Sequence, residues 1–109
     1  MRQIRQTIAV AFMFTIGAGS ARAGAHTWRI AEIFTNADGT VQFVELFCVT
    51  GSSENFVGGL QVTTGTNTFT FPGNLAGSTL NKRLLLATDA FTTLPGAPAR
   101  DYAIPSNFF

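Results

Sequence analysis

Apolar and polar side chains alternate along two neighbouring stretches of the chain, which is the pattern of β-strands that bury one face. The first stretch, Trp28 to Thr35, reads WRIAEIFT, and the second, Thr40 to Val49, reads TVQFVELFCV. Asn36-Ala37-Asp38-Gly39 lies between them, and Asp-Gly is a strong hairpin signal because both residues tolerate positive φ. The sequence therefore predicts a β-hairpin over residues 28–49.

Three further strands follow from the pattern. Leu60 to Thr64 and Thr68 to Phe71 are expected to be two short strands joined by a turn at residues 65–67. Arg83 to Thr88 is nearly continuous in apolar residues, as expected for a strand that is central or buried on both faces. Asp89 is a candidate N-cap for a single helical turn that ends before Pro95-Gly96.

Composition supports a strand-rich domain over residues 26–109. This part is rich in Thr, Phe, Val, Gly and Asn and poor in the helix formers Glu, Lys and Gln. Five strands are fewer than the seven or so of an immunoglobulin-like sandwich. The chain also ends on Phe108-Phe109, an apolar pair of the kind that a core covers. We therefore expect an all-β domain that is truncated at its C-terminus.

The first 25 residues have the layout of a secretory signal. Arg2 and Arg5 precede an apolar run from Ile8 to Ile16, and small residues follow from Gly17 to Ala25. The run is too short to cross a bilayer, which takes about 20 residues. Cleavage is expected after Ala23 or after Ala25. The mature chain, with no transmembrane segment, is then expected in the periplasm or outside the cell.

Removal of the signal changes the charge. The full chain carries a formal net charge of +1, whereas residues 26–109 keep four cationic and six acidic side chains and a net charge of −2. Scattered cations on a mildly acidic domain give no footprint for phosphates, which disfavours nucleic acid as a partner. A protein or a cell-surface polymer remains as the class of partner.

Single copies of cysteine and histidine limit the chemistry. Cys48 cannot form an intramolecular disulfide, and its apolar neighbours favour a buried structural thiol over a reactive one. His26 is the only histidine, too few for a zinc site of histidines and poorly placed for a catalytic triad. A chain that begins at Gly24 could chelate Cu(II) through His26. We expect no cofactor and no resident metal.

Glu32 and Glu45 are the candidate site. If Asp38-Gly39 forms a two-residue turn, Glu32 faces Glu45 directly across the hairpin, and like charges in that position destabilise a strand pair. Three roles explain why a sequence would have both glutamates in these positions: structural hydrogen bonds, a bound cation, or catalysis. A four-residue turn would remove the pairing.

The turn residues Asn36, Asp38 and Gly39, with Glu45 beyond them, also have part of the spacing of a calcium loop. Phe34 occupies the position of the first ligand, where an acid is required. A hairpin turn is therefore the preferred interpretation.

The same stretch resembles the lamin-tail-domain family in its bacterial secreted form. The matching residues are Ile30-Ala31-Glu32-Ile33, the turn, Gln42-Phe43-Val44-Glu45-Leu46 and Gly59-Leu60. Gln42 replaces the first acid of the family's second strand. The resemblance implies an immunoglobulin-like β-sandwich without a catalytic residue set of its own.

These features predict a secreted, non-catalytic module over residues 26–109 with a structural or binding role. In bacteria, domains of this kind are similar to accessory modules beside nucleases or other enzymes. The alternative is therefore the N-terminal accessory part of a larger exported hydrolase.

Overall fold

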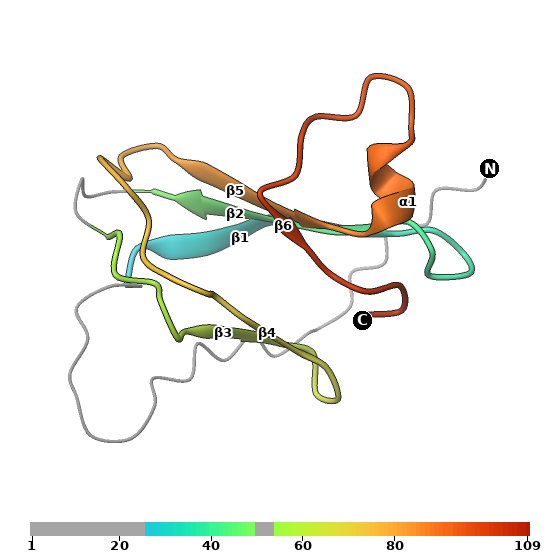
Figure 1. The fold of residues 1–109 in the computed structure, drawn as a ribbon, viewed down its shortest axis with the longest axis horizontal. Helices are drawn as coiled ribbons and strands as arrows, with labels where there is room; N and C mark the ends of the chain where they lie inside the picture. Colours follow the sequence, from blue (N-terminus) through green and yellow to red (C-terminus); the bar gives the residue numbers. More distant parts are fainter. Residues whose placement is uncertain (1–25, 50–53) are drawn as a thin grey trace. The chain divides into compact units, whose positions relative to one another are not determined.

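The computed structural model describes residues 26–49 and 54–109, and the predicted signal at residues 1–25 lies outside them. The described residues form a four-stranded sheet, a two-stranded sheet and one short helix (Figure 1). The chain divides into two compact units. Among the described residues, the first unit holds 30–47 and 83–109, and the second holds 26–29, 48–49 and 54–82. The prediction of a mainly β structure is confirmed.

The four-stranded sheet has the order β1-β2-β5-β6. Its strands are β1 (Trp28–Thr35), β2 (Gln42–Cys48), β5 (Arg83–Ala87) and β6 (Tyr102–Ala103). β2 and β5 are antiparallel, with Phe43 opposite Ala87 and Phe47 opposite Arg83. β5 and β6 are parallel, with Leu86 opposite Tyr102. The short β6 was not predicted, because two residues carry no periodic pattern.

β5 has the central position that its continuous apolar sequence predicts. It lies between β2 and β6, and all four residues from Leu84 to Ala87 are buried. In β2, by contrast, buried and half-buried residues alternate. Val44 and Leu46 on the buried face are at most 1% exposed. β5 thus has the burial that its pattern predicts, whereas the buried face of β2 also carries the polar Gln42.

The helix α1 (Asp89–Thr92) begins at its predicted cap residue, one residue earlier than predicted. Asp89 lies inside the first turn, and Thr88 is the N-cap residue without a side-chain capping bond. The reason lies in the sheet, because the Thr88 hydroxyl accepts the backbone N–H of Gln42 at 3.1 Å. The prediction that Asp89 caps the helix is therefore wrong. Its carboxylate lies 2.7 Å from Nη1 of Arg100 instead.

An aromatic cluster fills part of the first unit beside the helix. Phe34 stacks on Phe43 with ring centroids 5.6 Å apart, and Phe43 meets Phe91 of α1 at 5.3 Å. The buried residues around them are Val41, Leu85, Ala87 and Phe91. The helix is short, so its place depends on this packing rather than on its own propensity.

The second unit contains the hairpin of β3 (Gln61–Thr63) and β4 (Thr68–Thr70). Val62 pairs with Phe69, and the Thr64 N–H donates to the Asn67 carbonyl at 2.9 Å to close the turn. Gly65 has a φ of +86° in this turn, a conformation that favours glycine. The predicted second hairpin is confirmed, and β3 and β4 are each shorter than the ranges predicted for them.

Candidate functional site

Glu45 pairs with an arginine that the sequence did not single out as its partner. The Arg83 guanidinium on β5 binds the Glu45 carboxylate on β2 and lies 4.5 Å from the centre of the Phe47 ring. The side chains of Glu45 and Arg83 are 27% and 58% exposed. A cation from the chain itself therefore compensates Glu45. The pairing connects strands 38 residues apart, which no local motif reveals.

Glu32 lies on β1, the strand next to β2, and is exposed. The two candidate glutamates therefore belong to neighbouring strands, but their surroundings differ. Glu45 is half-buried in the ion pair with Arg83, while Glu32 is at the surface. This difference argues against treating them as a symmetrical pair of carboxylates.

The connection between β1 and β2 is wider than a two-residue turn. The Asn36 N–H donates to the Val41 carbonyl at 2.9 Å, which leaves four residues between this pair. The Gly39 N–H donates to the Asn36 carbonyl at 3.3 Å, and only Gly39 in the connection has a positive φ, of +74°. The expectation that a four-residue turn would change the register is wrong, because the Asn36–Val41 bond and the Phe34–Phe43 stack keep the register predicted for the two-residue turn.

Side chains within the connection bond to its backbone N–H groups. The Asp38 carboxylate accepts the Thr40 hydroxyl at 2.7 Å and the Thr40 N–H at 3.1 Å. The hydroxyl bond, followed by the N–H bond, lowers the pKa of Asp38 from its ordinary value. The Asn36 side-chain oxygen accepts the Val41 N–H at 3.0 Å. These are bonds within a turn, in agreement with the preferred interpretation of Asn36, Asp38 and Gly39.

The side chain of Gln42 connects β1, β2 and the segment at residues 108–109 within the first unit. It is 1% exposed, and its oxygen accepts the N–H groups of Phe108 at 2.7 Å and Phe109 at 3.3 Å. Its nitrogen donates to the Phe109 carbonyl at 2.8 Å and to the Thr35 hydroxyl at 2.9 Å. Sequence reasoning noted Gln42 only as a departure from the family pattern. The polar residue on the buried face of β2 was the available signal.

Asp101, the residue before β6, forms hydrogen bonds with the backbone of β5 as a paired strand residue would. The Asp101 carboxylate accepts the Leu85 N–H and the Asp101 N–H donates to the Leu85 carbonyl, both at 2.8 Å. Burial, and then the negative charge of Asp101, raises the pKa of the Tyr102 phenol. The acidic side chain thus has a structural partner in the sheet.

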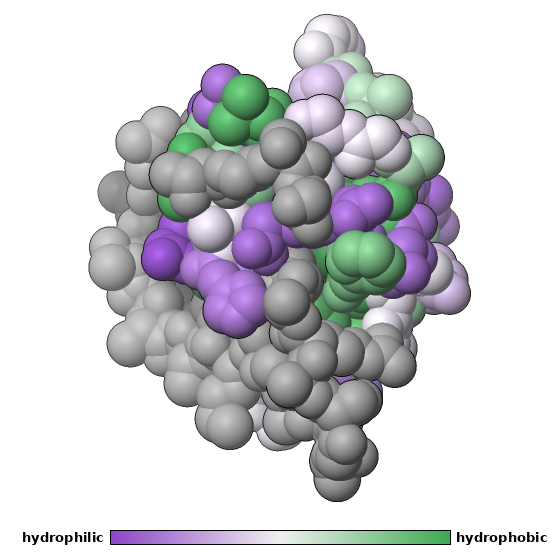
Figure 2. Space-filling view, turned by 90° about the vertical axis from the view of Figure 1, so that its left-hand side faces the viewer, coloured by the Kyte–Doolittle hydropathy of each residue, from purple (hydrophilic) through white to green (hydrophobic). Residues whose placement is uncertain are grey.

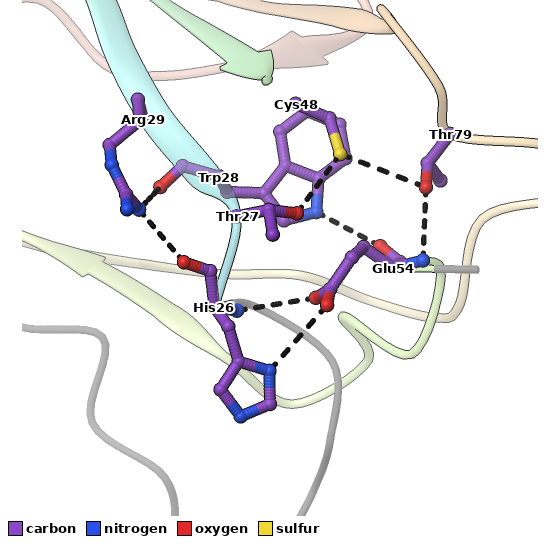
Figure 3. A network of polar contacts seen from close by, with 7 residues as sticks. All are labelled: His26, Thr27, Trp28, Arg29, Cys48, Glu54 and Thr79. Atoms are coloured by element: carbon purple, nitrogen blue, oxygen red, sulfur yellow. Dashed lines mark hydrogen bonds and ion pairs between the residues drawn. The ribbon is translucent and has the colours of Figure 1, made fainter. Parts of the chain in front are cut away.

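The second unit contains a polar network around Glu54 (Figure 3). The indole N–H of Trp28 donates to the Glu54 carbonyl at 2.9 Å, and the Glu54 N–H donates to the Thr79 hydroxyl at 3.0 Å. Thr79 and Cys48 are both fully buried, with the sulfur 3.8 Å from the Thr79 hydroxyl oxygen. The prediction that Cys48 is a buried thiol is confirmed. Sequence reasoning missed Glu54, because its partners lie at least 25 residues away.

The surface carries both polar and apolar side chains, and Figure 2 shows them interspersed on one face. Among residues 26–49 and 54–109, the large exposed apolar side chains are Val49, Phe56 and Leu80. Within the same residues, no group of three or more His, Cys, Asp or Glu side chains is placed to hold a metal ion. No helix in the described part of the chain is long and apolar enough to cross a bilayer.

No protein-family model, curated protein or solved structure matches the chain. The resemblance to the lamin-tail domain therefore stays a prediction from the motifs of residues 30–60.

Proposed function

We propose that the chain is an exported, non-catalytic module of the lamin-tail type, with an immunoglobulin-like β-sandwich as its fold and a structural or binding role. The N-terminal pattern of residues 1–25 supports export. The antiparallel pairing of β2 with β5 and of β3 with β4 is consistent with a sandwich topology. A protein or a cell-surface polymer is the class of partner that suits an exported module of mild negative charge.

One observation carries the non-catalytic part of the proposal: polar side chains that could do chemistry are bonded within the fold. Glu45 binds Arg83, Gln42 binds the backbone of residues 108–109, and Asp101 binds the backbone of Leu85. Among the described residues, every buried side-chain nitrogen and oxygen has a hydrogen-bond partner. Such satisfied contacts specify a fold, whereas paired catalytic carboxylates need an open cleft between them.

The test measures stability and hydrolysis on the same proteins. The full chain is expressed for export as wild type, Glu45→Gln, Arg83→Gln and the double variant. We expect each single change to lower the free energy of unfolding by less than about 1 kcal/mol, since both side chains are partly exposed. The double variant should lose less than the sum, because the pair acts as one unit. Urea unfolding measures these energies.

The same proteins are assayed with fluorogenic glycosides and esters, and with sedimentation on insoluble chitin, cellulose and peptidoglycan. We expect no turnover by any of them. Glu32→Gln is assayed beside them, because it removes the other carboxylate of the candidate pair, on the neighbouring strand. Turnover by the wild type that both Glu32→Gln and Glu45→Gln abolish, without a change in melting temperature, would overturn the proposal. Sedimentation of the protein with one of the polymers, without turnover, would support the role of an accessory module of a larger hydrolase.

A further inference from the structure

The backbone of His26 is bonded at both its nitrogen and its oxygen (Figure 3). Its N–H donates to one carboxylate oxygen of Glu54 at 3.2 Å, and its carbonyl accepts the guanidinium of Arg29 at 2.8 Å. Its imidazole Nδ1 lies 3.5 Å from the other oxygen of Glu54. This residue is also the first one after the second of the two predicted cleavage sites. An expendable linker residue would not need three such contacts.

Two contacts other than those with His26 hold the backbone of Glu54 in place. The indole N–H of Trp28 fixes its carbonyl, and the hydroxyl of Thr79 fixes its N–H. Trp28 is 3% exposed and Thr79 is fully buried, so both anchors belong to a packed region. The Glu54 side chain is 15% exposed, against 65% for His26. A positioned, largely buried carboxylate therefore faces the backbone nitrogen at residue 26.

We propose that His26 is the first residue of the mature protein and that Glu54 binds its α-ammonium group. The proposal rests on the export of the chain. Cleavage adds water across the peptide bond between Ala25 and His26, so that Ala25 gains a carboxylate and His26 gains an amine. The amine takes up a proton at neutral pH. The atom that donates one neutral hydrogen bond in the precursor then carries a positive charge beside Glu54.

The carboxylate beside this nitrogen favours an ammonium group over an amide. The Glu54 carboxylate accepts from it and favours a positive charge there, whereas the Arg29 guanidinium, which binds the carbonyl on the other side of the residue, opposes that charge. Among residues 26–49 and 54–109, the other titratable group recorded against the Glu54 carboxylate is the imidazole of His26 itself. A charge-assisted hydrogen bond is shorter and stronger than a neutral one. Cleavage at this bond therefore strengthens the link between the start of the mature chain and residue 54.

The pairing of the α-ammonium group with Glu54 makes the stability of the protein depend on pH. A free α-amine has a pKa of about 7.7–8.0, and a carboxylate partner raises the pKa of the amine in the folded protein. The stability that the pair adds is then fully present below about pH 8 and is lost as the pH rises through the raised pKa.

The first experiment determines the N-terminus of the protein recovered after expression of the full chain in a secreting bacterial host. Intact mass and N-terminal sequencing are expected to give His26. A mature chain that begins at Gly24 would overturn the inference and leave export standing. A precursor that keeps residues 1–25 would overturn export, on which the inference rests.

The second experiment moves the cleavage site by one substitution. Ala25→Gln removes the small residue before His26 but leaves Ala21 and Ala23 for cleavage before Gly24. At pH 7 we expect this longer chain to melt a few degrees below the wild type, as for the loss of a partly exposed ion pair. At pH 10 we expect the two proteins to have the same melting temperature. Glu54→Gln should abolish the difference, and Glu32→Gln, the control carboxylate, should preserve it.

Equal melting temperatures at pH 7, or a difference that persists with Glu54→Gln, would contradict the pairing. Glu54→Gln could prevent folding, so a measurement on the wild type is included. The pKa of the His26 α-amine is measured by NMR on protein with ¹⁵N-labelled histidine. A value clearly above about 8 is expected, and a value at or below the ordinary range of about 7.7–8.0 would overturn the proposal.

Discussion

The side chain with the most consequences for the first unit is the amide of Gln42. An amide on the buried face of a strand is costly unless its donors and acceptor are satisfied. Here the partners are the backbone groups of Phe108 and Phe109 and the hydroxyl of Thr35. Phe108 is itself 1% exposed. One polar residue thus allows the segment at 108–109 to be fixed against β2 without strand pairing.

We expect Gln42→Leu to destabilise the protein by about 2–4 kcal/mol, because it leaves buried backbone groups of residues 108–109 without partners. Urea unfolding measures the loss, and hydrogen exchange at the Phe108 amide should accelerate. Gln61→Leu is the control, because the Gln61 amide makes an exposed bond to Thr70 at 3.3 Å. Its expected effect is below about 0.5 kcal/mol. Equal losses for the two variants would contradict the role of Gln42.

At the scale of elements, the connection between β1 and β2 contains Gly39, which lies against Asn107 near the end of the chain. A Cβ atom at Gly39 would lie 2.1 Å from the side-chain oxygen of Asn107, and φ is +74°. The Asn107 N–H also donates to the Gly39 carbonyl at 2.9 Å. Gly65, in the turn between β3 and β4, has a φ of +86° with open space around it. The two turns separate the effect of crowding from the effect of backbone conformation.

We expect Gly65→Ala to cost about 1–2 kcal/mol of stability, which is the penalty of a left-handed conformation alone. Gly39→Ala should cost about 2–4 kcal/mol, since the side chain of Asn107 must also move. Thermal and urea unfolding of both variants give the comparison. A loss at Gly39 no larger than at Gly65 would show that the segment around Asn107 adapts freely. Gly39→Ala with Asn107→Ala should recover the excess.

The elements with a clear period were predictable, and those made by distant contacts were not. β1, β5 and the hairpin of β3 and β4 follow from alternation, continuous apolar runs and turn residues. β6 has only two residues and exists because Leu85 and Asp101 exchange hydrogen bonds beside it. The helix cap was mistaken for the same reason, since the hydroxyl of Thr88 serves a strand 46 residues away.

The candidate site follows the same division. Turn chemistry at residues 36–39 was visible in the sequence, as was the unusual presence of two glutamates on adjacent strands. The partner of Glu45 was not, because Arg83 reaches it only through the pairing of β2 with β5. Glu54 gave no local signal at all, and its place depends on Trp28 and Thr79. Side-chain partners across tertiary structure cannot be derived from spacing.

At the scale of the whole molecule, export would reverse the sign of the net charge. Residues 26–109 carry four cationic and six acidic side chains, a formal charge of −2 against +1 for the full chain. Two of the four cations are already paired with carboxylates, Arg83 with Glu45 and Arg100 with Asp89. These ion pairs partly neutralise the positive side chains, and we therefore expect weak binding of polyanions.

We expect the exported protein to bind an anion exchanger at pH 8 and to pass through a heparin column at about 150 mM salt, where only a patch of several cations resists screening. Glu32→Gln combined with Asp89→Asn removes two exposed negative charges and should elute earlier from the exchanger. Lys82→Gln is the matched control for heparin and should change nothing there. Retention on heparin that Lys82→Gln weakens would contradict the prediction that nucleic acid is disfavoured as a partner, because it would reveal a cationic surface that the net charge conceals.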